Sequence, residues 1–439
     1  MPFVPIKTNI YFLYYRRGTM KKYRWMKVDT ASIMFSSLSS KKWGRTFRMT
    51  VILKDEVKPE ILERAARDIM PRFPSMHSCI KKGFFWNYLE GTELLPEIRE
   101  EFSRQLLPIT IRNDGRPDFR IVYYKKRLGL ECAHYLGDGL GVNTYFNALI
   151  ERYVELKNNP DAPYCPTEFE EEEINNAFND YYVKGGSKDV EEEFRAYQIK
   201  GEIEEGFLQL VFAMMDVDEL HGKANEKGLT ITEYLASALI LGTIRHAEVP
   251  ISEPIVIAIP VNLRRFFPTK SIRNFTIQSR IDFFPEEKTD WTFDEVCDKV
   301  KGQLEKRLTV PELQKILNNF GSMANNEIIK YVPNFIKLPV VRSRQEKSHG
   351  NNTTILTNTG NSELSPVLEG EVLRADGVNG DTSGYGLIST CSALSCNGVF
   401  NLCFSACTHD LSWAKECVRV LSERGLRIRI ESTHGNGGK

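Results

Sequence analysis

The sequence repeats one series of expected elements in its two halves, and this repeat most restricts how the chain can fold. In the first half, 119–124 and 127–134 predict two strands joined by a short turn, followed by a loop and a long helix. In the second half, 386–396 and 399–407 predict two further strands, and 411–424 predicts a helix. A repeated unit of this kind is typical of two related lobes packed side by side.

The helix of the first half has a well-marked apolar face. Gly137 and Gly139 interrupt the chain before it, and apolar residues then recur at the spacing of one helical face. The residues expected to be buried are Val142, Tyr145, Phe146, Leu149, Ile150 and Tyr153. We therefore expect this helix to pack along its whole length against its own lobe.

The hairpin of the second half has a clear turn signal. Asn397 and Gly398 form the two-residue pair that favours a type I′ turn. This turn sets the register and predicts two cross-strand pairs, Cys391 with Phe404 and Cys403 with Ser392. No two cysteines then face each other directly.

Cysteine usage argues against a disulfide framework and against a metal centre. The chain has nine cysteines, an odd number, and we expect free thiols. The cysteines of the last strands lack the CxxC spacing of structural zinc sites; they are Cys391, Cys396, Cys403 and Cys407. We expect no metal.

Length and charge limit the classes of protein that remain. At about 150 residues per domain, 439 residues allow two large lobes. Prolines and an acidic run at Glu170–Glu173 mark a solvated linker over 166–204, between lobes at 1–165 and 205–439. The 58 basic residues balance 58 acidic ones, so net charge gives no reason to expect a nucleic-acid partner.

Targeting signals are also missing. No apolar run approaches the roughly 18 residues that span a bilayer, so we expect no membrane span. The N-terminus lacks the basic region, apolar run and cleavage site of a signal peptide. We expect a cytoplasmic protein.

One short segment could carry out chemistry. His134 ends the 127–134 strand on the same side as Leu128, Leu130 and Cys132, and a neutral imidazole there can accept a proton as a general base. The alternative is a core histidine with a structural role. Asp138 could equally be the N-cap of the helix that follows.

The segment His134 to Gly139, HYLGDG, resembles the HxxxDG motif of the chloramphenicol-acetyltransferase-like superfamily. This superfamily includes peptide-synthetase condensation domains, plant acyltransferases and bacterial alcohol acetyltransferase-like proteins. Further matches are Pro260–Arg264 at the end of a strand, Arg273–Phe275 at the start of the next, and the Asn397–Gly398 turn. The resemblance extends from about residue 23 to residue 430.

The resemblance implies a fold and a set of site residues. It implies an α/β (α+β) fold of two lobes, each a mixed sheet flanked by helices, with an active-site tunnel between them. His134 would be the general base, and Gly139 would belong to the same catalytic motif. Asp138 would orient the histidine loop by pairing with a buried arginine. We expect that partner to be Arg264, with Arg280 as the alternative.

The resemblance also implies an activity. The expected reaction moves an acyl group, with acetyl as one candidate, from a thioester donor to an alcohol or amine acceptor. Acyl-CoA would be the co-substrate, with no bound cofactor. Ala133 replaces the second histidine that condensation domains carry, and 381–386 (DTSGYG) is a distant substitute for the DFGWG motif of plant enzymes.

Two alternatives to an acyl-CoA-dependent enzyme stay open. One is a condensation-type enzyme that takes its acyl group from a separate acyl carrier protein. The other is a non-catalytic binding protein that keeps the fold. The intact His134, Asp138 and Gly139 argue against the second alternative.

A basic cluster follows the Pro260–Arg264 segment. It contains Arg264, Arg265, Lys270 and Arg273. We expect Lys270 and Arg273 to bind the phosphates of the donor at a tunnel mouth, because a neutral protein needs local positive charge for a phosphate. The alternative is a solvated basic loop.

Overall fold

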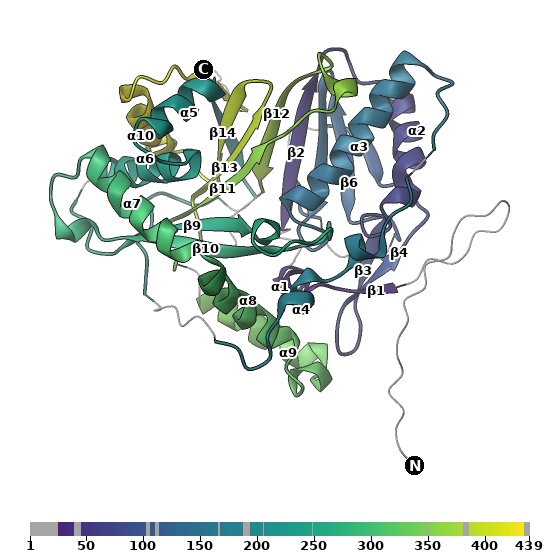
Figure 1. The fold of residues 1–439 in the computed structure, drawn as a ribbon, viewed down its shortest axis with the longest axis horizontal. Helices are drawn as coiled ribbons and strands as arrows, with labels where there is room; N and C mark the ends of the chain where they lie inside the picture. The colour runs from purple at the N-terminus through teal and green to yellow at the C-terminus, as the bar shows by residue number, and fades with distance from the viewer. Residues whose placement is uncertain are drawn as a thin grey trace.

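The computed structural model describes residues 25–38, 45–101, 106–109, 114–165, 167–187, 194–204, 206–247, 249–347, 350–380 and 386–433. The described strands form three sheets. Figure 1 shows the two larger sheets side by side, with α2 and α3 outside one sheet and α5, α6 and α10 beside the other. Both sheets mix parallel and antiparallel pairs, so the predicted α/β fold class is confirmed.

The first lobe is built on a five-stranded sheet in the order β12-β2-β7-β6-β5. Its strands are β2 (Thr46–Leu53), β5 (Glu97–Glu100), β6 (Phe119–Tyr124), β7 (Arg127–Ala133) and β12 (Val372–Asn379). Two helices pack against each other on this lobe, α2 (Pro59–Ile69) and α3 (Gly139–Asn158). The predicted apolar face of α3 is confirmed, because all six of its expected core residues are buried.

The second lobe is built on a seven-stranded sheet in the order β10-β9-β11-β13-β14-β8-β15. Its strands are β8 (Gln209–Asp216), β9 (Ile255–Asn262), β10 (Thr276–Phe283), β11 (Thr354–Asn361), β13 (Ser389–Cys396), β14 (Val399–Ala406) and β15 (Arg429–Ser432). Its helices are α5 (Val217–Asn225), α6 (Ile231–His246), α7 (Phe293–Arg307) and α10 (Ser412–Glu423). The elements β6-β7-α3 and β13-β14-α10 confirm the predicted repeat.

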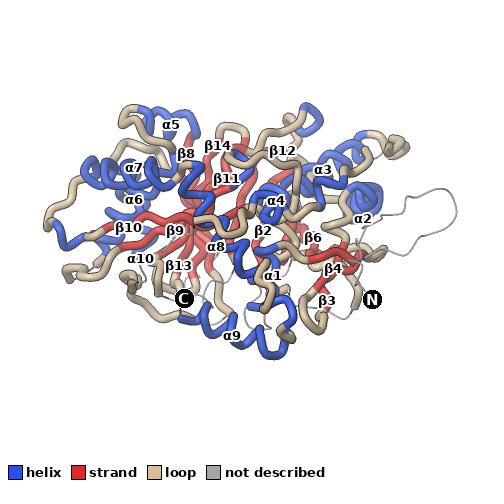
Figure 2. Tube along the Cα trace, turned by 60° about the horizontal axis from the view of Figure 1, so that its bottom comes forward, coloured by secondary structure: helices blue, strands red, loops and turns tan. Residues whose placement is uncertain are grey.

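A third layer of structure lies below the two lobes in Figure 1. It contains a small sheet of β1 (Trp25–Lys27), β4 (Tyr88–Gly91) and β3 (Ser78–Lys81). Its helices are α1 (Thr30–Leu38), α4 (Ala177–Tyr181), α8 (Val310–Ala324) and α9 (Asn334–Lys347). Figure 2 shows α1 between β2 and α9, near the middle of the molecule. Helix α1 contacts both α8 and α9.

The predicted hairpin is confirmed residue by residue. Asn397 and Gly398 have φ values of 50° and 73°, as a type I′ turn requires. The register places Cys391 opposite Phe404 and Ser392 opposite Cys403. The cysteines are free thiols in the structure.

The two lobes do not follow the division expected from the sequence. Strand β12 comes from the expected second lobe at 205–439, yet it pairs with β2 in the sheet of the first lobe. It also packs beside β13 and β14. This crossover was not visible in the sequence, because pairing between distant strands leaves no local pattern.

The acidic segment is also more than a solvated linker. Its residues form the short 3₁₀ helix η2 (Glu171–Ile174). Glu173 forms an ion pair with Arg72 of the first lobe, with 2.5 Å between Nη1 and Oε2. The backbone carbonyl of Glu173 accepts a hydrogen bond from the Ile272 amide of the second lobe. This segment therefore ties the two lobes together.

Candidate active site

His134 lies directly after β7, in the turn that leads to α3. Its backbone amide donates to the carbonyl of Arg45, at 2.7 Å. Its ring stacks on Phe35 of α1, with 4.2 Å between ring centroids, and lies 5.0 Å from the ring of Phe47 on β2. Aromatic side chains from two elements therefore hold the imidazole in place.

The surroundings of His134 favour the neutral imidazole. Burial lowers its pKa below the usual value, while its own backbone, Asp138 and Asn274 act in the opposite direction. The Nδ1 atom is buried and has no hydrogen-bond partner among the described residues. A neutral imidazole has one ring nitrogen without a hydrogen, which can accept a proton near pH 7.

Asn274 connects the histidine turn to the second lobe. Its amide nitrogen donates to the backbone carbonyl of His134 at 3.1 Å and to Ser32 Oγ at 3.3 Å. The Ser32 hydroxyl in turn donates to the carbonyl of Tyr135 at 2.6 Å. Sequence reasoning assigned Asn274 no function of its own, although the residue stood inside the matched Arg273–Phe275 segment.

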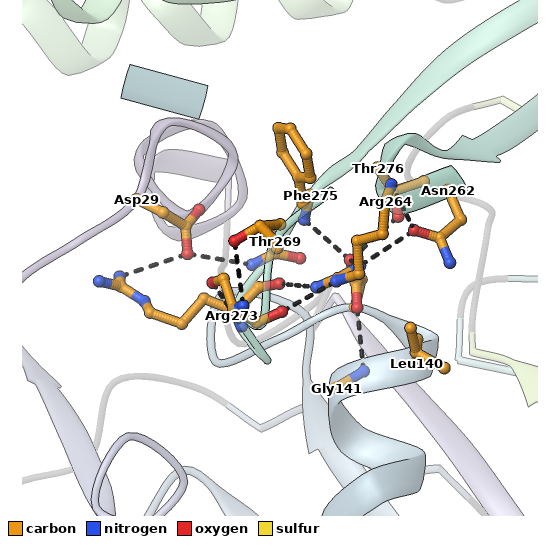
Figure 3. A network of polar contacts seen from close by, with 12 residues as sticks. Asp29, Leu140, Gly141, Asn262, Arg264, Thr269, Arg273, Phe275 and Thr276 are labelled. Atoms are coloured by element: carbon orange, nitrogen blue, oxygen red, sulfur yellow. Dashed lines mark hydrogen bonds and ion pairs between the residues drawn. The ribbon is translucent and has the colours of Figure 1, made fainter. Parts of the chain in front are cut away.

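Asp138 is buried, and its partners Gly141, Arg264, Phe275 and Thr276 belong to the polar network that Figure 3 shows from close by. Its Oδ1 accepts from the Gly141 amide at 3.0 Å, so Asp138 is the N-cap of α3. Its Oδ2 accepts from three donors of the second lobe: Arg264 Nη1 at 2.7 Å, the Phe275 amide at 2.8 Å and Thr276 Oγ1 at 3.0 Å. One carboxylate therefore caps a helix and joins the lobes.

Arg264 uses its whole guanidinium group in this network. Its Nε donates to the carbonyl of Ser271 at 2.8 Å, and its Nη2 donates to the carbonyl of Arg273. Arg280, the alternative partner of Asp138, lies elsewhere: its Nε is 3.0 Å from Asp282 Oδ1. The structure thus brings Asp138 together with Arg264 and leaves Arg280 apart.

Two glycines allow the lobes to approach closely: Gly139 of the motif and Gly141 in the first turn of α3. A Cβ atom on Gly139 would lie 3.2 Å from the Thr359 methyl group on β11. A Cβ atom on Gly141 would lie 1.7 Å from the carbonyl oxygen of Ile272, which no side chain can do. The second glycine is therefore required by the backbone of the opposite lobe.

The structure separates the two residues that were expected to bind donor phosphates. Arg273 is buried; its Nη1 donates to the carbonyl of Lys27 at 2.9 Å, and its Nη2 is 3.3 Å from Asp29 Oδ2. Lys270 is exposed and forms an ion pair with Glu170 at 2.6 Å. The expected basic cluster at a tunnel mouth is not formed here, because carboxylates and carbonyls from other segments already surround both side chains.

Three further expectations concern the DTSGYG segment, a metal site and a membrane span. Residues 381–385 of the DTSGYG segment lie outside the described residues. Within the part of the chain that the structure describes, no cluster of three or more His, Cys, Asp or Glu side chains could hold a metal ion. Nor does any helix there have both the length and the apolar composition for a membrane crossing.

The sequence matches no protein-family model and no curated protein, whereas many solved structures match its fold. TRI101 from Fusarium sporotrichioides, complexed with coenzyme A and T-2, is 10% identical and aligns over 92% of this chain and 99% of that chain, with a TM-score of 0.61. The TRI3 trichothecene 15-O-acetyltransferase from the same organism is 11% identical over 92% and 96%, with a TM-score of 0.59. The epimerization domain from the third module of tyrocidine synthetase B is 10% identical over 93% and 97%, also with a TM-score of 0.59.

Proposed function

We propose that this chain, which has the two-lobed fold of the chloramphenicol-acetyltransferase-like superfamily, is an acyltransferase. It would move an acyl group from a thioester donor to an alcohol or amine acceptor. The observation that carries the proposal is the setting of His134: an imidazole whose pKa is lowered by burial, held between two aromatic rings and bonded through its backbone carbonyl to Asn274 of the opposite lobe.

The proposed reaction assigns roles to His134, Asp138 and Asn274. His134 would take the proton from the acceptor as its oxygen or nitrogen attacks the thioester carbonyl. The C–S bond then breaks, and the proton passes to the departing thiolate. Asp138 and Asn274 would act as positioning residues, because they bond to the backbone around His134 and to the opposite lobe. The inter-lobe tunnel that would admit both substrates stays a prediction.

Acyl-CoA is the donor that we favour. TRI101 and the TRI3 trichothecene 15-O-acetyltransferase share this fold along nearly their whole length, and TRI101 was solved with coenzyme A. The epimerization domain of tyrocidine synthetase B is similar to this chain to the same extent, and it supports the alternative of a carrier-protein donor equally well. Both kinds of donor present their acyl group as a thioester, so the proposed chemistry at His134 is common to them.

Mass spectrometry of the purified full chain tests this proposal. We expect turnover with a panel of acyl-CoA thioesters and mixed hydroxyl and amine acceptors. His134→Ala should lower turnover by about 10² to 10⁴ while the protein stays folded. The control is His409→Ala, because His409 also lies in the chain between β14 and the helix that follows, but is exposed and bonds to Glu204. A folded His134→Ala variant with near-normal turnover would contradict the assignment.

The donor is tested separately from the base. Acyl-CoA, the corresponding acyl-pantetheine and an acyl-loaded carrier protein should be compared at one acceptor concentration. We expect kcat/KM to be highest with acyl-CoA. A clear preference for the carrier protein would support the condensation-type alternative, and no turnover with any donor would support a binding protein.

A further inference from the structure

An apolar cavity of about 390 Å³ lies apart from the polar network of His134 and Asp138. Its walls come from α1, from the β3–β4 connection and from the segment that contains α9. Lining side chains include Val28, Ile33, Met34, Val332, Leu338 and Val341. Cavities of a few hundred Å³, mostly apolar and with few polar groups, are typical of sites for small ligands. We refer to it as the α1–α9 cavity.

The α1–α9 cavity contains one buried cation, Lys337. Its side chain is only 6% exposed. The ammonium group donates to the carbonyl of Phe85 and lies 3.1 Å from the centroid of the Trp86 ring. No carboxylate among the described residues forms an ion pair with it, and burial lowers its pKa to about 8. A buried charge is costly unless an opposite charge accompanies it.

The cavity opens onto an apolar surface. Ile336 and Val340 line the cavity and are also 51% and 55% exposed, so they mark its mouth. Beside them, Phe84 and Phe335 are 65% and 69% exposed, with 6.3 Å between their ring centroids. Clustered exposed apolar side chains mark a surface that meets apolar material.

The walls of the cavity are fixed by hydrogen bonds. Asn334, at the start of α9, donates from its backbone amide to the carbonyl of Phe84 and from its side chain to the carbonyl of Gly83, both at 2.8 Å. The side-chain Nδ2 of Asn87 donates to Ser36 Oγ on α1 at 3.2 Å. The three walls are therefore joined without any ligand, so the cavity is formed in advance.

We propose that the α1–α9 cavity binds the aliphatic chain of an anionic amphiphile such as a fatty carboxylate. The chain would occupy the apolar interior, and the carboxylate would pair with the ammonium group of Lys337. This inference goes beyond the proposed acyl transfer, since neither His134 nor a thioester donor takes part. The two sites share α1, because Phe35 stacks on His134 while Ile33 and Met34 line the cavity.

Trp86 gives a direct readout, because it lines the cavity. Dibromostearate, kept below its critical micelle concentration, should quench the fluorescence of the full chain in a saturable way. Trp86→Phe should remove that saturable part, whereas Trp291→Phe, a change in the second lobe, should keep it. Saturable quenching that is unchanged in Trp86→Phe would overturn the location of the site.

Chain length tests the apolar interior. Unbrominated carboxylates should displace dibromostearate, with affinity rising about fourfold for each added methylene until the cavity is full. Val332→Phe narrows the cavity and should bring this plateau to a shorter chain. Affinity that does not depend on chain length would overturn the proposal.

The head group tests the role of Lys337. Stearate should bind at least tenfold more tightly than octadecanol to the unmodified protein, a comparison that needs no variant. Lys337→Met should remove that preference, while Lys330→Met, at an exposed lysine paired with Glu327, should keep it. Equal binding of both probes would overturn the anionic part of the proposal.

The binding measurements are independent of acyl transfer. They use no donor, and they should give the same result in the His134→Ala variant. If that variant binds dibromostearate normally but the wild-type chain shows no turnover, only the proposed function fails. If turnover is found and dibromostearate does not bind, only the cavity proposal fails.

Discussion

At the scale of single residues, the state of His134 depends on groups from three segments. Phe35 and Phe47 pack against the ring, and burial lowers the pKa of the imidazole. Asn274 raises that pKa and also holds the backbone carbonyl of His134. The same asparagine therefore influences both the position of the base and its proton affinity.

The first prediction concerns the pH dependence of the proposed reaction. A base must be neutral, so kcat/KM with an alcohol acceptor should fall as pH drops through the lowered pKa of His134. The half-maximal pH should lie below 6.5, the usual value. Asn274→Leu removes a group that raises the pKa, so its profile should move to lower pH. A lower rate with an unshifted profile would limit Asn274 to a structural role.

The second prediction concerns His77, a fully buried histidine whose Nε2 lies 3.1 Å from the Tyr145 hydroxyl. Burial lowers its pKa from 6.5 to about 3, so the folded state prefers the neutral form. The unfolded chain binds a proton first as pH falls below 6.5, and this group's contribution to stability is lost progressively toward pH 3. Between pH 7.5 and pH 5 the loss should be about 2 kcal/mol.

Urea unfolding at the two pH values measures this effect. His77→Phe should unfold with a free energy that changes less between pH 7.5 and pH 5 than that of the wild type. His221→Gln, at an exposed position on α5, serves as the control and should keep the wild-type difference. Equal pH dependence in His77→Phe and wild type would contradict a neutral buried histidine.

At the scale of elements, the start of α3 depends on the opposite lobe. Gly141 lies in the first turn of α3, where a Cβ atom would overlap the Ile272 carbonyl. The overlap is with backbone, which cannot move aside as a flexible side chain can. The glycine is therefore needed for packing between the lobes.

The third prediction follows from this contact. Gly141→Ala should lower the free energy of unfolding and the catalytic rate, because the loop that contains Ile272 must move away from α3. Gly302→Ala on α7 is the matched control: nothing lies within 4 Å of its added Cβ, so alanine should be neutral or stabilise by up to about 1 kcal/mol. The melting temperatures of the two variants test this prediction. Equal melting temperatures for Gly141→Ala and Gly302→Ala would contradict a close approach at Gly141.

At the scale of the whole molecule, Asp138 and Arg264 form a buried ion pair between the lobes. Their side chains are 3% and 9% exposed, and each makes further hydrogen bonds to backbone. Removing either partner leaves the other charge buried. Such a change typically costs about 3 to 5 kcal/mol.

The fourth prediction is tested by a double-mutant cycle. Asp138→Ala and Arg264→Ala should each lower the free energy of unfolding by about 3 to 5 kcal/mol. The double variant should lose less than the sum of the two single losses. Lys270→Ala also breaks an ion pair, but Lys270 and its partner Glu170 are both exposed. This variant should therefore change the free energy of unfolding little. Additive losses at Asp138 and Arg264 would contradict direct coupling between the lobes.

Local pattern in the sequence determined the individual elements. Helical spacing predicted the buried face of α3, and the Asn397–Gly398 pair predicted a hairpin together with its register. The order of these elements, with the resemblance, predicted the two-lobed fold. These features were accessible because each depends on residues close together in the chain.

Only the tertiary structure decided how distant segments meet. In the structure β12 pairs within the sheet of the first lobe. Arg264, and not Arg280, pairs with Asp138. Arg273 is buried beside Asp29. The tertiary structure also brought Phe35 against His134. No local pattern encodes such contacts, since they join residues up to hundreds of positions apart and depend on how the two lobes pack. The sequence therefore determined the candidate base and the strand and helix beside it, whereas the packing of the lobes decided its surroundings.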